Sequence, residues 1–159
     1  MTQSISENTA VSLRSATAAD LSSIFALLSV AELPTTGVPE SLAGFTVAEH
    51  EGRIVGVVGL ETCCREYALL RSTAVASDYR KHGIGRRLVE RAIADAEASG
   101  FAALYLLTNT AERYFPSFGF TRVSRDVVPA EVKATEEFTS VCCSSATVMT
   151  LALDDAPAP

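Results

Sequence analysis

The sequence predicts an α/β fold in which a mixed, mostly antiparallel sheet of about six to seven strands is flanked by helices. Two features carry this prediction. Residues 44–49 and 53–62 have strand character and are joined by the turn Glu51-Gly52, which is the pattern of a β-hairpin. Residues 67–107 follow as strand, helix and strand, and such a unit has parallel strands and a right-handed crossover.

The segment before the hairpin predicts one strand and one helix. Residues 1–10 are polar and without periodicity, so we expect a flexible leader. Alternating side chains predict a short strand over 11–15. Thr17 is a suitable N-cap, and apolar residues at helical spacing predict an amphipathic helix over about 18–30. His50, beside the hairpin turn, is expected in solvent.

The strand–helix–strand unit is the most regular part of the chain. Its first strand covers 67–76, and apolar residues at helical spacing over 84–96 predict the helix, which Gly100 ends. Residues 101–107 are apolar on both faces, as expected of a buried parallel strand.

Beyond this unit the pattern is weaker. Thr108 is a candidate cap for a short helix over 110–117, and Gly119-Phe120 begins another strand. A proline at the start predicts a helix within 129–143, and residues 146–153 alternate like a final strand.

Length and charge narrow the function classes. With 159 residues, we expect a single domain over 11–153, followed by an acidic tail over 154–159. The 13 Lys and Arg against 19 Asp and Glu give a net charge of −6, which disfavours duplex nucleic acid and anionic membrane as partners. The longest apolar runs, 54–60 and 101–107, fall short of the about 20 residues that span a membrane.

The cysteines point to a reduced compartment. They lie in two adjacent pairs, Cys63-Cys64 and Cys142-Cys143, and neither histidine is at zinc-finger spacing from them. Adjacent strand residues point to opposite faces, so neither pair is a ready chelate and we expect no metal. Reduced thiols, with no basic and apolar signal pattern at the N-terminus, predict a cytoplasmic protein.

One segment indicates an anion site. Residues 80–88, Arg-Lys-His-Gly-Ile-Gly-Arg-Arg-Leu, lie between a predicted strand and a predicted helix. Gly83 and Gly85 let the backbone approach a ligand and adopt positive φ at little cost. Unpaired N–H groups and the helix dipole favour an anion at a helix start. Five of the 13 basic residues lie within 12 positions, at 80, 81, 86, 87 and 91. The segment predicts a diphosphate or phosphorylated-cofactor site; the alternative is a glycine turn beside a solvated basic helix face.

Two other phosphate-binding patterns do not fit. The pattern GxxxxGK[ST] is absent. A dinucleotide-binding fingerprint needs a third glycine where this chain has Leu88, and an acidic residue where it has Thr108-Asn109.

The run Arg80-x-x-Gly83-x-Gly85 after an apolar strand resembles the acyl-CoA pyrophosphate loop of the GNAT N-acetyltransferases. The run Phe115-x-x-x-Gly119-Phe120 resembles the second landmark of that family, Tyr-x-x-x-Gly-Phe. More narrowly, residues 69–72, 106–111 and 137–142 resemble a subgroup of arsenic-resistance N-acetyltransferases.

The resemblance implies a GNAT-like fold and an acetyl-CoA site between two splayed parallel strands, 67–76 and 102–108. The main chain of Ala74 and Val75 would pair with the pantetheine amides, and a backbone N–H there would polarise the thioester carbonyl. The other implied cofactor-binding residues are those of the glycine loop, namely Arg80, Lys81, His82, Gly83, Ile84, Gly85 and Arg86, and those after the next strand, namely Thr108, Asn109, Ala111, Phe115 and Phe118. The resemblance also suggests a homodimer.

The acid and base are open on the sequence alone. The family's tyrosine position is Phe115, which has no proton to donate, so Tyr114 is the candidate acid, against a partly buried core tyrosine or a water proton. The family's occasional carboxylate position is Leu69, so Glu61 is the candidate base, directly or through water, with Glu66 as the alternate. Both glutamates have the alternative of surface turn carboxylates.

Arg71 lies in the middle of a predicted strand beside apolar residues, where an unpaired charge is costly. It shares a strand face with Leu69, which we expect to meet the acceptor. We therefore expect Arg71 to bind a substrate carboxylate or oxyanion, and the alternative is a structural salt bridge to Glu61. For the cysteine thiols we favour small buried side chains over a functional site.

Two functions follow from these expectations. The first is an enzyme that transfers the acetyl group of acetyl-CoA to the amine of a small molecule by direct attack on the thioester. Its acceptor is an amino acid or an arsenic-containing analogue if Arg71 binds a carboxylate. The second is a catalytically weak CoA- or metalloid-binding sensor, which the phenylalanine at position 115 keeps open.

Overall fold

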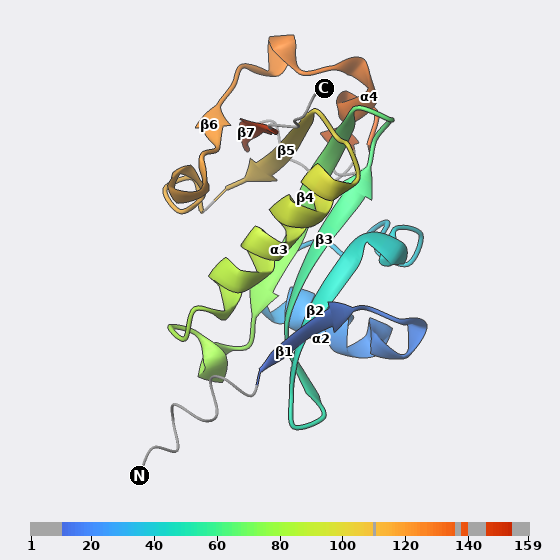
Figure 1. Cartoon of the computed structure of the whole chain (residues 1–159), viewed down its shortest axis with the longest axis vertical. Helices are drawn as coiled ribbons and strands as arrows, with labels where there is room; N and C mark the ends of the chain where they lie inside the picture. The colour runs from blue at the N-terminus through green and yellow to red at the C-terminus, as the bar shows by residue number, and fades with distance from the viewer. Residues whose placement is uncertain (1–10, 110, 136–137, 140–145, 154–159) are drawn as a thin grey trace. The chain divides into compact units, whose positions relative to one another are not determined.

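The strands belong to one mixed sheet (Figure 1). In the computed structural model, which describes residues 11–109, 111–135, 138–139 and 146–153, seven strands are hydrogen-bonded in the order β1-β2-β3-β4-β5-β7-β6. No helix within these ranges is long and apolar enough to cross a membrane. The predicted leader and acidic tail lie outside the described residues.

The chain forms two compact units. The first ends at Gly59 and resumes over Ser72–Ala92, and the second comprises Leu60–Arg71 and the residues from Ile93 onward. Three elements contribute residues to both units, namely β3 (Arg53–Thr62), β4 (Tyr67–Val75) and α3 (Ile84–Ala98). The expectation of a single domain over 11–153 stays a prediction.

The first unit contains the N-terminal strands, the whole of α2 and the start of α3. Besides its parts of β3, β4 and α3, its elements are β1 (Ser12–Ser15), the 3-10 turn η1 (Ala18–Asp20), α2 (Leu21–Val30), the 3-10 turn η2 (Leu42–Gly44), β2 (Phe45–His50) and the 3-10 turn η3 (Ser77–Tyr79). β1 pairs with β2 and β2 pairs with β3, both antiparallel, so the predicted hairpin is confirmed.

Two helices cover opposite faces of this part of the sheet (Figure 1). On one face, Leu28 of α2 packs in a core with Val57 and Ala74. On the other face, a Cβ atom at Gly56 would lie 2.9 Å from Cδ1 of Leu88 in α3. The absence of a side chain at Gly56 therefore lets α3 pack directly on β3.

The second unit contains the C-terminal strands. Besides its parts of β3, β4 and α3, its elements are β5 (Ala103–Thr108), the 3-10 turn η4 (Phe115–Phe118), β6 (Thr121–Arg122), the 3-10 turn η5 (Arg125–Val127), α4 (Ala130–Lys133) and β7 (Thr147–Ala152). β4 and β5 are parallel, as the strand–helix–strand pattern predicts, and their register runs from Tyr67↔Ala103 to Leu69↔Tyr105. β7 pairs with β5 and with β6, both antiparallel.

One helix prediction in this unit is wrong, and another is confirmed in part. In place of a helix over 110–117, the described residues form a turn and η4; Pro116 lacks the N–H that a continued α-helix needs, and Gly119 ends the turn at φ +102°. Within the helix expected over 129–143, α4 begins directly after Pro129, and residues 138–139 are π-helical, with the Thr139 N–H donating to the Thr135 carbonyl at 3.0 Å. Between them, Thr135 Oγ1 donates to the Val132 carbonyl at 2.8 Å, which competes with continued α-helical hydrogen bonding after α4.

A buried carboxylate holds the start of α2. Arg14 of β1 donates to both oxygens of Asp20, at 2.9 and 3.0 Å, and its Nε donates to Glu49 at 2.8 Å. The Asp20 carboxylate also accepts from the Thr17 backbone N–H at 2.8 Å. These bonds, above all the one from Arg14, lower the pKa of Asp20 to about 2.

Asp20→Asn is expected to lower the free energy of unfolding at pH 7 by about 2 kcal/mol. The folded-state pKa is below the ordinary value of 3.8, so the contribution is present above pH 4 and is lost as the pH falls from about 4 to 2. Urea unfolding at pH 7 and pH 2.5 measures both quantities. At pH 2.5, which is still slightly above the folded-state pKa of Asp20, the difference between the variant and the wild type should be less than half of its value at pH 7, whereas the exposed-carboxylate control Glu40→Gln should match the wild type at each pH.

Candidate active site

The glycine loop, defined here as residues 80–85, joins η3 to α3 in the first unit. Gly83 has φ +80°, so its predicted left-handed conformation is confirmed. For Gly85 that prediction is wrong, because it lies in the first turn of α3 without a positive φ. Lys81, which is not a glycine, has φ +71°. The loop therefore turns at two left-handed residues and leads directly into a 15-residue helix.

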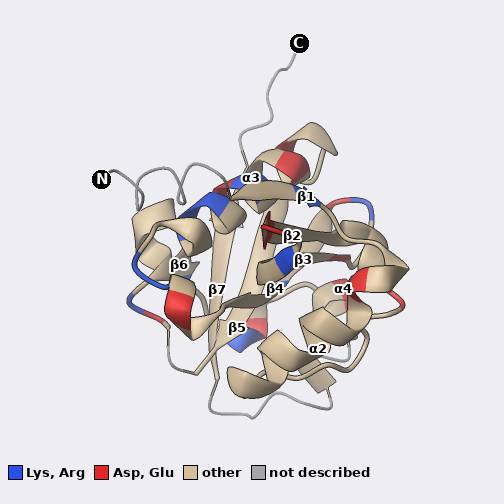
Figure 2. Ribbon diagram, turned by 90° about the horizontal axis from the view of Figure 1, so that it is seen from below, with Lys and Arg blue, Asp and Glu red and all other residues tan. Residues whose placement is uncertain are grey.

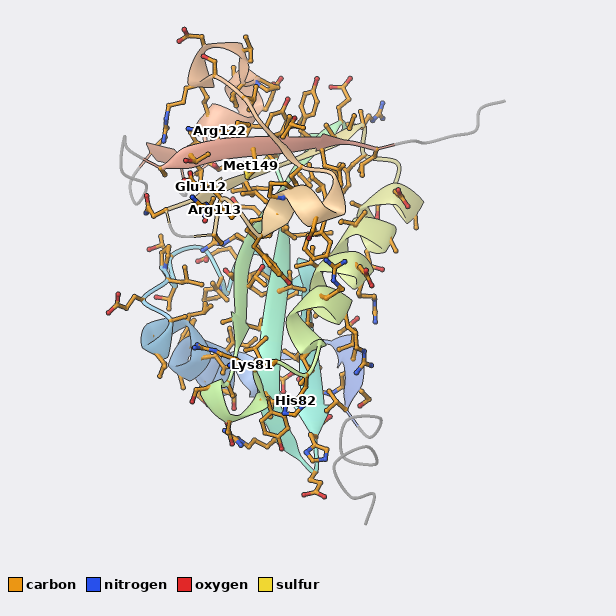
Figure 3. The ribbon with its side chains drawn as sticks, turned by 90° about the vertical axis from the view of Figure 1, so that its left-hand side faces the viewer. Lys81, His82, Glu112, Arg113, Arg122 and Met149 are labelled. Carbon is orange, nitrogen blue, oxygen red and sulfur yellow. The ribbon has the colours of Figure 1, made fainter. Side chains whose placement is uncertain are left out.

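The basic residues around this loop differ in their partners. Arg80 Nε donates to the Val75 carbonyl at 3.2 Å, Arg86 pairs with Glu90 at 3.2 Å, and Arg87 donates to the Val11 carbonyl at 3.1 Å. The side chains of Lys81 and His82 are exposed at the loop (Figure 3). The basic stretch, blue in Figure 2, thus both ties the helix to its surroundings and presents cations at the helix start.

The C-terminal end of β4 opens onto a cavity of about 520 Å³ within the first unit. Val75 and Arg80, which belong to the implied cofactor set, line it together with Leu27 and Val30 of α2. Ala74, by contrast, is 7% exposed and packs in the core below α2. The sequence reasoning missed the contribution of α2. The structure shows this contribution through Val30 at the end of α2, whose apolar side chain is 74% exposed.

Ser72 interrupts the extended backbone of β4. Its φ is +60°, a conformation that is rare for residues other than glycine, and the residue is buried. Such local strain persists only where the surrounding structure holds it, and it concentrates at functional sites. It falls immediately after Arg71 and two residues before Ala74, in the strand to which the resemblance assigns the thioester site.

In the second unit, a hydrogen bond links the end of β5 to Ala111. Thr108 Oγ1 accepts from the Ala111 backbone N–H at 2.9 Å, which is the bond expected of a capping residue, but the described residues do not form the helix that Thr108 was expected to cap. Asn109 is exposed and Ala111 is half-buried. The pairing of β4 with β5 ends at Leu69↔Tyr105, whereas the pairing of β7 with β5 continues to Thr108.

An aromatic cluster follows this turn. Phe115 is 7% exposed and lies edge-on to Phe120, with ring centroids 5.8 Å apart. Tyr114 is 39% exposed, and its ring lies 5.2 Å from those of Phe115 and Phe118. Phe115 is therefore a core residue. Tyr114, which carries the hydroxyl, is more exposed than Phe115.

The structure brings Glu61 and Arg71 together. Arg71 Nη1 donates to Glu61 Oε1 at 2.9 Å, and the side chains are 1% and 17% exposed respectively. The ion pair that was the alternative for Arg71 is present, and Glu61 is its more accessible member. Glu66 is exposed, and its backbone carbonyl accepts from Ala102 N at 2.7 Å. The pair thus holds Glu61, and not Glu66, in a defined position.

Cys63 is a poor nucleophile. Burial raises the pKa of Cys63 to about 12, so its thiol is protonated at neutral pH. Cys142 and Cys143 lie outside the described residues. Within the described ranges, no group of three or more His, Cys, Asp or Glu side chains is placed to hold a metal ion.

Comparisons with known proteins agree with this geometry. Residues 41–122 match the model of the acetyltransferase (GNAT) domain. The amino-acid acetyltransferase of Ralstonia nicotianae is 32% identical over 127 residues, which cover 75% of this chain and 28% of that protein. The chain spans less than two thirds of the length of the curated relatives that it matches first.

Two solved structures share the fold. N-acetylglutamate synthase of Neisseria gonorrhoeae, complexed with coenzyme A and N-acetyl-glutamate, has a TM-score of 0.80 and 22% identity over 91% of this chain and 35% of that one. Rv2747 of Mycobacterium tuberculosis, in complex with CoA, has a TM-score of 0.76 and 24% identity over 89% of this chain and 99% of that one. With the mixed sheet, the glycine loop at a helix start and a family match over more than half of its residues, this chain belongs to the GNAT acetyltransferase family.

Proposed function

We propose that this protein is an N-acetyltransferase that moves the acetyl group of acetyl-CoA to the amine of a small molecule. The observation that carries the proposal is the glycine loop. A left-handed Gly83, the N-terminal turn of α3 and exposed cationic side chains converge in a chain whose net charge is −6. This combination suits a diphosphate, which the donor contains.

In this proposal the donor binds along the end of β4 and at the glycine loop. Arg80 and Lys81, with the backbone over residues 81–86, hold the diphosphate, and the cavity between α2 and the end of β4 receives part of the donor. The main chain at Ala74 and Val75 binds the pantetheine amides. Thr108, Asn109, Ala111, Phe115 and Phe118 complete the site, as the family resemblance implies.

Glu61 is proposed to take the proton of the acceptor ammonium, directly or through water, so that the neutral amine attacks the thioester carbonyl. Its ion pair with Arg71 supports this role because it fixes the carboxylate in one orientation while leaving it partly accessible. The leaving thiolate receives a proton from Tyr114 or from water. The exposure of Tyr114 and its position beside Phe115 support the tyrosine as donor.

The acceptor is proposed to carry a carboxylate, which places it among amino acids and their arsenic-containing analogues. Two observations support this class. Arg71 supplies a buried guanidinium beside Glu61, so that the two charges complement the carboxylate and the ammonium of an amino acid. The Ralstonia relative is an amino-acid acetyltransferase. The finer resemblance to arsenic-resistance enzymes rests on residues 69–72, 106–111 and 137–142.

Two measurements test the proposal. Calorimetry with acetyl-CoA is expected to show binding, and a free-thiol assay is expected to show CoA release with amino acids, arsenic-containing amino acids or both. Binding without thiol release for any amine would favour a sensor over an enzyme. No binding would contradict the assignment of the glycine loop.

The carboxylate requirement has its own test. Each accepted amino acid should lose most of its kcat/KM when offered as the methyl ester, and Arg71→Ala should raise the KM of the acid but not of the ester. Equal KM values for the acid in a folded Arg71→Ala variant and in the wild type would remove Arg71 from the acceptor site.

A further inference from the structure

His50, the last residue of β2, is buried. Only 5% of its surface is exposed, so the expectation of a solvated histidine is wrong. Its register partner is Arg53, the first residue of β3, across the Glu51-Gly52 turn. The physical reason for the burial is a contact from another part of the chain. Tyr79, 29 positions further on, lies edge-on to the imidazole, with ring centroids 5.5 Å apart.

The contact between His50 and Tyr79 is a short hydrogen bond. Nδ1 of His50 lies 2.6 Å from the Tyr79 hydroxyl oxygen. Tyr79 is the last residue of η3, and the next residue is Arg80, where the glycine loop begins. His50 thus contacts the residue immediately before the loop that we propose to bind the diphosphate.

A second set of contacts joins the same hairpin to η3. The Arg53 guanidinium donates to both oxygens of Asp78, at 2.9 and 3.2 Å, and lies over the Tyr79 ring at 5.4 Å. Arg53 and Asp78 are both more than half exposed, so their ion pair alone contributes little. The hydrogen bond of His50, whose residue is 5% exposed, is the more buried contact in this set.

The choice of histidine at this position carries a cost. Nε2 of His50 is buried and, among the described residues, has no hydrogen-bond partner; the nearest carboxylate oxygen, of Glu51, is 3.9 Å away. An unmet buried polar atom is destabilising, and an apolar side chain of similar volume would avoid it. The need to fill space therefore does not explain an imidazole here, whereas the bond from Nδ1 to the Tyr79 hydroxyl does.

We propose that His50 is a positioning residue for the glycine loop: through its hydrogen bond to Tyr79 it holds Arg80 and the following backbone in the conformation that binds the diphosphate of the acyl donor. The diphosphate part of this inference rests on the proposed function. Lys81 and His82 follow Arg80 in the loop (Figure 3), so the proposed anchor also positions their backbone.

The test compares His50→Leu, His50→Asn and Tyr79→Phe in the full chain. Leucine fills the space without a polar atom, and asparagine keeps one at about the place of Nδ1. We expect His50→Leu and Tyr79→Phe each to raise the Kd for acetyl-CoA about fivefold. His50→Asn should restore most of the affinity, and the double variant His50→Leu/Tyr79→Phe should be no weaker than either single variant. Glu51→Gln, an exposed change on the same hairpin, should leave the Kd at the wild-type value.

Hydrogen exchange of the ligand-free protein separates the two proposals. Backbone amides over 79–85 should exchange faster in His50→Leu than in the wild type, while amides of β7 should not change. Equal exchange over 79–85, or an unchanged Kd in folded His50→Leu, overturns the anchoring role. If the wild type itself does not bind acetyl-CoA, the proposed function fails; the exchange rates then still decide whether His50 holds the loop.

Discussion

Glu61→Gln is expected to lower kcat about 10²- to 10⁴-fold while the Kd for acetyl-CoA stays near the wild-type value. Glutamine keeps an oxygen that can accept from Arg71 Nη1, but it has no carboxylate to take the proton of the acceptor ammonium. The loss should therefore fall on turnover and not on donor binding. Steady-state kinetics with calorimetry of acetyl-CoA binding measures the two quantities separately.

The controls for Glu61→Gln address stability and the choice of carboxylate. The substitution removes the Glu61 negative charge beside the buried Arg71, so thermal unfolding must show that the variant is folded at the assay temperature. Glu131→Gln, at an exposed position of α4, should keep wild-type activity. A large loss in Glu66→Gln together with an active Glu61→Gln would transfer the proposed role to Glu66.

Gly59→Ala is expected to lower the free energy of unfolding by about 1–3 kcal/mol. Gly59 pairs with Phe45 across β2 and β3, and a Cβ atom at position 59 would overlap the Phe45 ring. Phe45 is 1% exposed and packs in the core with Ile24 and Leu28, so the ring has little room to move. Urea unfolding of the two proteins measures the difference.

A double variant identifies the cause of this loss. Phe45→Leu removes the ring that the new Cβ would meet, so Gly59→Ala should cost clearly less in the Phe45→Leu background than in the wild type. Equal costs in both backgrounds would show that the effect comes from the strand backbone and not from the Phe45 ring.

The fold was predictable where the signal is local. The hairpin around Glu51-Gly52 and the parallel strands 67–76 and 101–107 follow from periodicity and turn residues, and the structure confirms both. The predicted helix over 110–117 is wrong because Pro116 lies in a 3-10 turn. The spacing of apolar residues does not distinguish such a turn from an α-helix. The placement of β7 between β5 and β6 pairs segments far apart in the chain, and no local pattern encodes such a pairing.

The candidate site divides in the same way. The glycine loop was found because a left-handed glycine, a helix start and basic residues are neighbours in sequence. The local hydrogen bond of Thr108 was predictable because its partner, Ala111, is three residues away, but the helix that it was expected to cap does not form. The lining of the cavity by α2 was missed, since Leu27 and Val30 reach the end of β4 only through packing.

The sequence by itself determined the order of the N-terminal hairpin and the strand–helix–strand unit, the left-handed glycine at the start of α3 and the family, because each depends on spacing and on the conformational freedom of individual residues. Only the tertiary structure decided that Arg71 pairs with Glu61 and that His50 is buried against Tyr79. These pairs join residues 10 and 29 positions apart. Their formation depends on the β-strand register and on the path of the chain after β4, which arise from the packing of the whole unit.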